Sequence, residues 1–326
     1  MIGRSRQMLV FLVFISAVIL ICAPFAGLAD ISLSSVFQDS VTERIFWQIR
    51  VPRVAGAFIA GAVLAVAGMS FQSMFRNDLA TPYTLGVSSG AALGAVIAIK
   101  LFSDGLFLNL PFVEILSFAG ALATVGLIFL LASAKKRNTA QFLILAGIAV
   151  NFTASGLILF IQFLASGSES SSMIRWMMGS LDYTGMEPVI KMLCAFFIIV
   201  PVAFFLHREL DLMKINTEIA QSRGVNIKRV NNIIFFTVSF AVAAVVSQTG
   251  PIGFIGLIAP HIGRNLVGRE HRYLIPASLL IGGLLLLISD TIARTVIAPS
   301  EIPVGVITAL AGGPFFLFLL IRSSKS

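Results

Sequence analysis

The segment GVSSG at residues 86–90 matches the G-x-S-x-G pattern that presents a nucleophilic serine in many hydrolases. That chemistry requires a strand, a sharp turn and a helix around the serine, with His and Asp partners close in space. Here the segment opens an apolar run in which Gly86, Gly90 and Gly94 recur on one helical face. Small residues at this spacing let membrane helices approach closely, so the pattern favours helix packing. The alternative, an intramembrane hydrolase, requires Ser88 to be the nucleophile.

The residues that could bind a metal are scattered along the chain. His207, His261 and His271 form no H-E-x-x-H motif and no other paired spacing typical of a metal site. Cys22 and Cys194 each lie within an apolar run, where a small core residue is a simpler interpretation than a disulfide or a metal ligand. We therefore expect no metal, no cofactor and no catalytic residue in this chain.

The glycine-rich segment GPIGFIGLIAPHIG at residues 250–263 contains no P-loop, G-x-x-x-x-G-K-[ST]. Its glycines and prolines are typical of a helix that is broken or bent. The apolar runs are also expected to lack the buried carboxylates of ion-coupled carriers, because Asp290 is close to the end of its run, beside Arg294. Energy for transport must then come from another protein.

Composition indicates where all these residues lie. The chain has 326 residues, of which 57% are hydrophobic and 12% charged, whereas a soluble domain has about 25% charged residues. We predict a single all-α polytopic membrane domain over residues 1–326, with ten transmembrane helices of about 20 residues each. The expected spans are Met8–Leu28, Val54–Met74, Tyr83–Lys100, Phe112–Ser133, Gln141–Leu164, Val189–Leu206, Val230–Ser247, Gly253–Val267, Tyr273–Ile292 and Val304–Ile321.

Charge predicts the orientation of these spans. If the N-terminus is cytosolic, most of the 23 Lys and Arg residues fall on the cytosolic side, as the positive-inside rule requires. With ten spans, the C-terminus is then cytosolic too. Outer loops are expected at about 29–51 and 165–188, and the second holds a flexible segment, Ser166–Ser172, before a short helix along the membrane. The basic residues form no stripe with interleaved aromatics, so we expect no nucleic acid as a partner. Membrane lipid is the expected surrounding partner.

The cytosolic loop at about 207–229 combines charge with an apolar stripe. Leu212, Ile215 and Ile219 lie on one face of a predicted helix, and Gly224 is placed to end it. Two interpretations remain open, a docking surface for another protein or a solvated connector. An exposed apolar stripe favours docking.

Several blocks of residues together resemble the permease family of type II ABC importers for ferric siderophores, haem and cobalamin, over nearly the whole chain. They are Arg50-Val51-Pro52-Arg53; Arg76 to Pro82 with Leu85-Gly86; Gly253 to His261 with Arg264, Gly268, His271 and Arg272; and Glu301 to Thr308 with Gly313-Pro314. Two positions depart from the family pattern, because Asp78 stands where proline is usual and Arg223 where leucine is common.

The resemblance implies partners and sites. It implies a second permease subunit, either a copy of this chain or a paralogue, around one central pathway, two ATP-binding subunits that hydrolyse ATP, and a periplasmic or lipid-anchored binding protein. Arg50, Arg53 and Arg294 match the outer arginines that dock the binding protein, and we expect them to be exposed. The loop that couples to the ATPase is implied to include Asp211, Glu218, Ala220, Gln221, Arg223, Gly224 and Val225.

The resemblance also implies a function. The chain is expected to be a non-enzymatic permease subunit in a bacterial cytoplasmic membrane. Its expected substrate is an iron chelate, and among iron chelates a ferric siderophore is favoured. Haem, cobalamin and an oxyanion remain alternatives within the family, and an ion-coupled secondary carrier is the alternative outside it.

Overall fold

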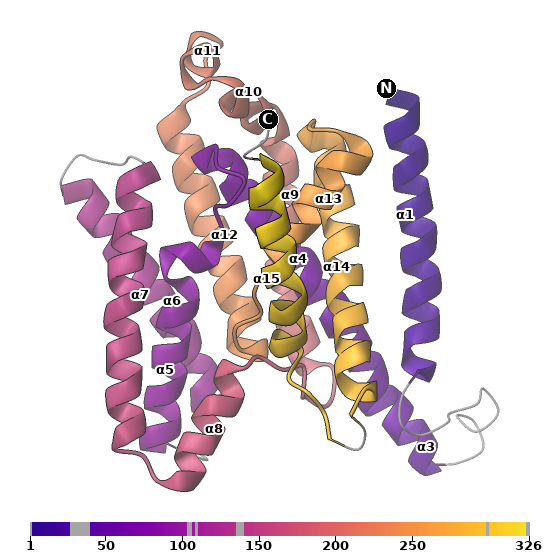
Figure 1. Cartoon of the computed structure of the whole chain (residues 1–326), viewed down its shortest axis with the longest axis vertical. Coiled ribbons are helices and arrows are strands. Elements are labelled where there is room, and N and C mark those ends of the chain that lie inside the picture. The colour runs from indigo at the N-terminus through magenta and orange to yellow at the C-terminus, as the bar shows by residue number, and fades with distance from the viewer. Residues whose placement is uncertain are drawn as a thin grey trace.

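The computed structural model of the chain describes residues 2–26, 40–102, 106–107, 110–134, 140–297 and 300–323. Apart from one short hairpin, the regular structure of this part is helical (Figure 1). The elements are α1 Ile2–Cys22, η1 Ala23–Phe25, α3 Ser40–Ile45, η2 Phe46–Arg50, α4 Val51–Phe75, η3 Pro82–Leu85, α5 Val87–Phe102, β1 Leu106–Phe107, β2 Leu110–Pro111, α6 Phe112–Ala134, α7 Ala140–Phe163, α8 Gly167–Met177, α9 Glu187–Phe205, α10 His207–Ile215, α11 Thr217–Ser222, α12 Ile227–Thr249, α13 Ile255–Val267, α14 His271–Thr295 and α15 Val304–Ser323.

Each of the ten predicted apolar runs coincides with a helix, which confirms a polytopic all-α membrane fold. Seven helical stretches of the described chain are long and apolar enough to cross a membrane, and α5 and the described part of α15 are shorter apolar helices. Helix α13 has only 13 residues, or about 20 Å of helix. The start of α1 and the end of α15 lie on the same side as α10 and α11, opposite α3 and α8, as an even number of crossings requires (Figure 1).

Helix α4 lies at the centre of the bundle, and nearly every residue along it is buried. It packs against α14 and α13 through glycines. A Cβ atom at Gly61 would overlap the carbonyl oxygen of Gly282 in α14, and one at Gly68 would overlap the carbonyl of Gly256 in α13. Backbone therefore meets backbone at both contacts, which only small residues allow.

Helices α5 and α6 form a second close pair at the edge of the bundle. Cβ atoms at Gly90 and Gly94 would overlap backbone oxygens of Gly120 and Leu116 in α6. Gly86 precedes α5 with φ +78°, a left-handed conformation that favours glycine. The three glycines thus lie where the four-residue spacing predicts close packing, and no strand precedes the serines.

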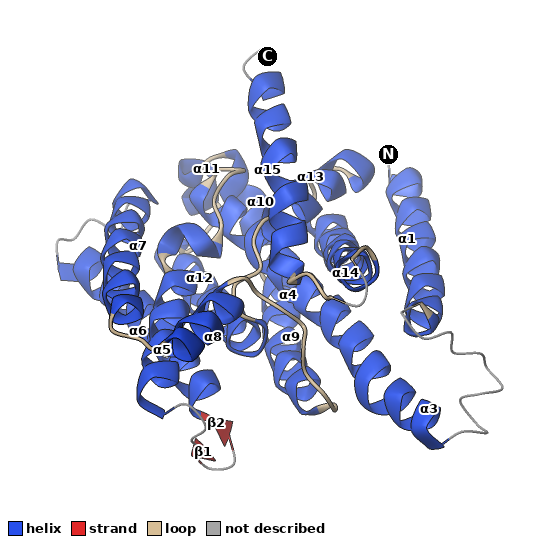
Figure 2. Ribbon diagram, turned by 60° about the horizontal axis from the view of Figure 1, so that its bottom comes forward, coloured by secondary structure: helices blue, strands red, loops and turns tan. Residues whose placement is uncertain are grey.

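Two of the expected loops contain helix instead. Residues 40–50 of the first outer loop form α3 and the π-helical η2, which continue into α4 (Figure 2), and the remainder, 27–39, lies outside the described residues. The segment Ser166–Ser172 was expected to be flexible, but it forms the N-terminus of α8. The short helix predicted after Ser172 is present, but it starts earlier than expected. Sequence patterning missed its first turns because serines are poor helix formers, whereas Ser166 and Glu169 cap the helix reciprocally.

Glu169 has a second partner that fixes α8 in place. Its Oε2 atom accepts hydrogen bonds from the backbone of Ser166 at 2.7 Å and from Lys100 Nζ, at the end of α5, at 2.9 Å. The backbone donor first, and then the lysine, lower the pKa of Glu169 to about 2. The carboxylate therefore stays charged, and α8 is held across the outer end of α5.

Candidate functional site

Three arginines gather at the outer ends of α4 and α14, and they are buried. Arg50, Arg53 and Arg294 are 6%, 8% and 6% exposed. The expectation that they are exposed was therefore wrong. Hydropathy and sequence position predict the side of the membrane on which they lie, but they do not reveal the acids that other elements bring to them.

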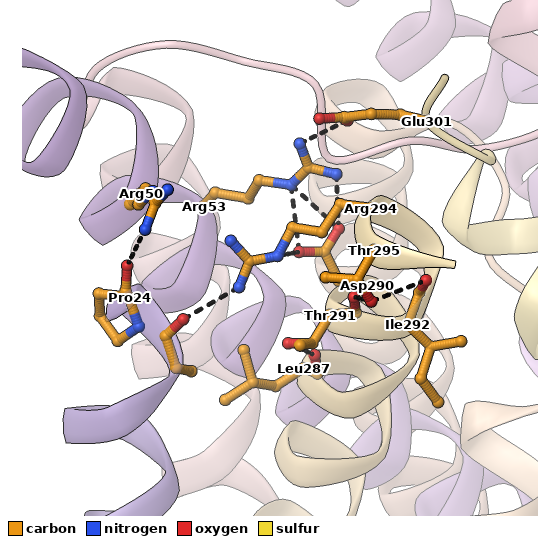
Figure 3. Close-up of polar contacts among 11 residues, drawn as sticks. Pro24, Arg50, Arg53, Leu287, Asp290, Thr291, Ile292, Arg294, Thr295 and Glu301 are labelled. Carbon is orange, nitrogen blue, oxygen red and sulfur yellow. Dashed lines mark hydrogen bonds and ion pairs between the residues drawn. The ribbon is translucent and has the colours of Figure 1, made fainter. Parts of the chain in front are cut away.

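Arg53 is the centre of this arginine cluster (Figure 3). Its Nε and Nη2 atoms donate to the carboxylate of Asp290 in α14 at 3.0–3.1 Å, and its Nη1 atom donates to Glu301 Oε2 at 2.7 Å. This bidentate geometry is the strong form of an arginine–carboxylate pair. Asp290 is fully buried, so the expectation that the apolar runs lack a buried carboxylate was also wrong.

The two other arginines hold backbone carbonyls. Arg50 Nη1 donates to Pro24 O at 3.1 Å, and Arg294 Nη2 donates to Ala23 O at 3.0 Å. Arg294 Nε also lies 3.9 Å from Asp290. The cluster consequently ties the end of α1 to α4 and α14, and its charges are engaged within this chain.

A large cavity opens beside the cluster on the outer side. Its volume is about 1040 Å³. Its wall carries charges of both signs among serines and apolar residues, and the charged residues are Arg53, Glu169, Arg175, Asp182 and Glu301. A cavity of this size is comparable to sites that hold a whole organic ligand.

The cytosolic loop forms two short helices, α10 and α11, which we call the coupling unit. The single helix that the stripe predicted was wrong, because Asn216 is extended (φ −159°, ψ 135°) and its side chain accepts the N–H of Glu218 as a new N-cap. The break leaves Ile215 73% exposed and Ile219 43% exposed. The unit therefore carries an exposed apolar surface.

The residues expected to couple to an ATPase take different places in this unit. Asp211 contacts His271 at the start of α14, and Ala220, a residue of α11, is buried. Gln221 lines a cavity of about 740 Å³ below the unit. Gly224, at φ +83°, follows α11 in a left-handed turn. The remaining residues lie on or beside the surface of the unit: Glu218, Arg223 and Val225.

Asp78, the departure in the inner turn, has partners on two elements. Its Oδ1 atom lies 3.4 Å from Lys214 Nζ in α10 and 3.8 Å from Arg264 Nη2 in α13. Partial burial disfavours the charged form, but Arg264 and Lys214 outweigh it and lower the pKa of the carboxyl group below its ordinary value. An aspartate here therefore joins the inner turn to the coupling unit, a contact that a proline cannot make.

Some of the serines and histidines considered for a nucleophile or a metal site make contacts that hold the fold together. Ser89 Oγ lies 2.6 Å from Asn151 Oδ1 and 3.0 Å from Gly86 O, so its one proton has an acceptor within the fold. Among the described residues no group of three His, Cys, Asp or Glu side chains could hold a metal ion. Sequence reasoning missed a different constellation, Ser73, Asp211 and His271, because its members come from three separate elements.

Comparison with known proteins identifies relatives over the whole chain. The FecCD transport family matches residues 9–322. The Fe(3+)-citrate import system permease protein YfmE of Bacillus subtilis is 40% identical, over 86% of this chain and 83% of that protein. The hemin transport system permease protein HmuU of Yersinia pestis is 36% identical, over 99% of this chain and 97% of that protein. Other similar permeases are named for cobalamin and molybdate import.

A solved structure described as an inward-facing metal-chelate type ABC transporter has a TM-score of 0.87 to this chain and is 29% identical. The match covers 97% of this chain and 99% of that one. The arrangement of helices is therefore that of an ABC importer permease.

Proposed function

Because this chain belongs to the FecCD transport family and is an ABC transporter permease subunit, we propose that it passes an iron chelate, a ferric siderophore first among them, across the bacterial cytoplasmic membrane. The observation that carries the choice of a chelate is the outer cavity of about 1040 Å³. An oxyanion would fill a small part of that volume, whereas an organic chelate of several hundred cubic ångströms would fill much of it. Relatives named for ferric citrate and hemin import support the same choice.

Two ATP-binding subunits dock, in this proposal, against the coupling unit. The exposed Ile215 and Ile219 supply an apolar contact, and charged residues surround them. An exposed apolar patch with a polar rim is typical of a protein interface. Of the residues expected in this contact, we propose that Glu218, Gln221, Arg223, Gly224 and Val225 meet the ATPase. Asp211 and Ala220 face the body of the protein and support the unit from behind. This side and both termini are then cytosolic.

A binding protein docks on the outer side, at the mouth of the cavity. Arg53 and Glu301 line the cavity, and Glu301 keeps an exposed side chain. Since Arg50, Arg53 and Arg294 are buried, we propose that they act in docking by holding the shape of this rim while its exposed neighbours meet the partner. Electrostatic contacts at such a rim mainly affect the rate of association.

A second permease subunit completes the pathway in this proposal. Helix α7 exposes Leu145, Phe152 and Phe163, and α15 exposes Leu310. Lipid covers part of this apolar surface and a second subunit, a copy or a paralogue, covers the rest. The substrate passes between the two subunits.

Purification of the complex and reconstitution in vesicles test the proposal. Vesicles that hold the complex and its binding protein should accumulate iron supplied as ferric citrate or a ferric hydroxamate, and only with ATP inside. Uptake that proceeds without ATP and collapses when an ionophore dissipates the ion gradient would identify a secondary carrier. Accumulation of molybdate, haem or cobalamin in place of both chelates would agree with an ABC importer but contradict the proposed substrate.

A further inference from the structure

Three side chains from α4, α10 and α14 meet at the cytosolic end of the bundle. His271 Nδ1 lies 2.6 Å from Asp211 Oδ1, and His271 Nε2 lies 2.6 Å from Ser73 Oγ. The backbone N–H of His271 donates to the same Asp211 oxygen at 3.0 Å. One imidazole therefore bridges the coupling unit and the two helices that form the centre of the fold.

This Ser–His–Asp chain is not built for hydrolysis. His271 is 0% exposed and Ser73 is 1% exposed, so no substrate reaches either of them. Ser73 Oγ also lies 3.0 Å from Met69 O in its own helix, a common contact for a helical serine. The same three residue types thus serve to join elements here.

The contacts of the coupling unit divide between its two helices. Asp211 and Lys214, three residues apart on α10, hold His271 and Asp78 respectively, and Leu210 and Met213 of the same helix are fully buried. Most of α11 projects from the body of the protein (Figure 1). Helix α10 is therefore the anchored half of the unit, and α11 is the projecting half.

We propose that His271 is a positioning residue for coupling, whose bonds to Asp211 and Ser73 make α10, the start of α14 and the end of α4 move as one body when the ATPase displaces α11. The inference rests on the proposed ATPase contact, but on no particular substrate. Its physical basis is that a short hydrogen bond to a carboxylate is strong, and that breaking it would leave the buried His271 ring without a partner on that side. The pair between Asp78 and Lys214 is more exposed and adds a weaker second attachment.

The test measures whether α10 and α14 move together. Spin labels at two exposed positions outside the proposed contact, Arg208 in α10 and Ile288 in α14, report their distance in the purified complex before and after ATP with vanadate is bound. In the natural sequence we expect no change in this distance. In Asp211→Ala and His271→Gln we expect a nucleotide-dependent change, because α10 then moves without α14.

Matched variants separate coupling from stability. Glu270→Ala removes a neighbouring exposed carboxylate and should behave as the natural sequence. Asp211→Asn keeps the oxygen that accepts both bonds but loses its charge, so the distance should change less than in Asp211→Ala. In vesicles, uptake of ferric citrate or a ferric hydroxamate per ATP hydrolysed should fall about tenfold in Asp211→Ala, a usual size for coupling between sites. ATP hydrolysis itself should continue.

Two outcomes would overturn the inference. One is a distance that already changes in the natural sequence, and the other is a distance that stays constant in Asp211→Ala. Crosslinking of a cysteine at Ile219 to the ATPase separates this failure from that of the proposed function. If the crosslink forms and Asp211→Ala remains coupled, the docking surface stands and the role of His271 does not.

Discussion

The two ends of the α4–α14 pair use charge in opposite ways. At the outer end, Arg53 and Asp290 are buried and satisfy each other. At the opposite end, which we propose to be cytosolic, His271 is buried but Asp211 is one-third exposed, and the coupling unit beyond it presents apolar residues to its surroundings. Between the two ends the helices touch through Gly61 and Gly282. The buried charges of the outer end are therefore closed on one another, whereas the other end presents an exposed apolar surface.

This difference changes what a charged residue at each end is expected to do. A buried pair that loses one member leaves an unpaired charge in an apolar environment. An exposed pair that loses one member leaves a charge in water. Variants at the outer end should therefore alter stability first, and variants on the coupling unit should alter binding first.

The largest effect is expected from breaking the outer pair. Arg53→Met leaves the Asp290 carboxylate buried without its main partner, which costs about 3–5 kcal/mol. Chemical unfolding in detergent micelles measures this loss, and the double variant Arg53→Met with Asp290→Leu should recover most of it. If Arg53→Met unfolds at the same denaturant concentration as the natural sequence, the outer end is not closed on itself.

The second largest effect is expected at the glycine contact between α4 and α14, which lies between the two ends of this helix pair. Gly61→Ala places a methyl group against the carbonyl of Gly282, and overpacking of this kind costs about 1–3 kcal/mol. The same unfolding experiment measures the effect. Gly313→Ala is a control, because a Cβ atom there meets nothing within 4 Å. Equal effects of the two variants would argue against the close α4–α14 contact.

On the coupling unit, Ile219→Asp should change binding without a comparable loss of stability. Ile219 is exposed, so its effect on unfolding should stay within about 0.5 kcal/mol. A minority of interface residues cost more than about 1 kcal/mol when truncated, or roughly fivefold in affinity, and a charge placed at an apolar contact should cost at least that much. Titration of the purified ATPase against the chain in detergent measures this. If the affinity for the ATPase is unchanged, the coupling unit is a solvated connector and not a docking surface.

The smallest effect is expected from Asp78→Asn, about 0.2–1 kcal/mol at neutral pH because the pair is partly exposed. The pKa of Asp78 is lowered in the folded protein, so its contribution is complete above the unfolded value of about 3.9 and is lost as the pH falls through the folded value. The difference between the natural sequence and Asp78→Asn in unfolding should therefore vanish at low pH. A difference that persists there would point to a cause other than charge.

Local patterns predicted the helices well because a membrane helix depends on the average hydropathy of its own residues. All ten runs coincide with helices, although α13 is far shorter than a usual span. Patterning failed at Ser166–Ser172 and at Asn216, where single side-chain caps decide whether a helix forms or breaks. Caps depend on local hydrogen bonds that a hydropathy average does not contain.

The candidate sites were predicted less completely. The three outer arginines and the cytosolic loop were identified from sequence, but burial of the arginines was not. Arg53 meets a partner 237 residues away, and His271 meets Ser73 at a separation of 198 residues. No motif joins positions so far apart.

By itself the sequence determined that this chain is an all-helical membrane protein, and blocks of motifs indicated its family, because composition, apolar run length and short motifs are properties of neighbouring residues. The tertiary structure alone decided which charges are buried, which apolar residues remain exposed on the coupling unit, and that Asp211, His271 and Ser73 meet. The physical reason is that the cost of a charge and the value of a hydrogen bond depend on what lies across the bundle, and α4 and α14 bring those distant positions together.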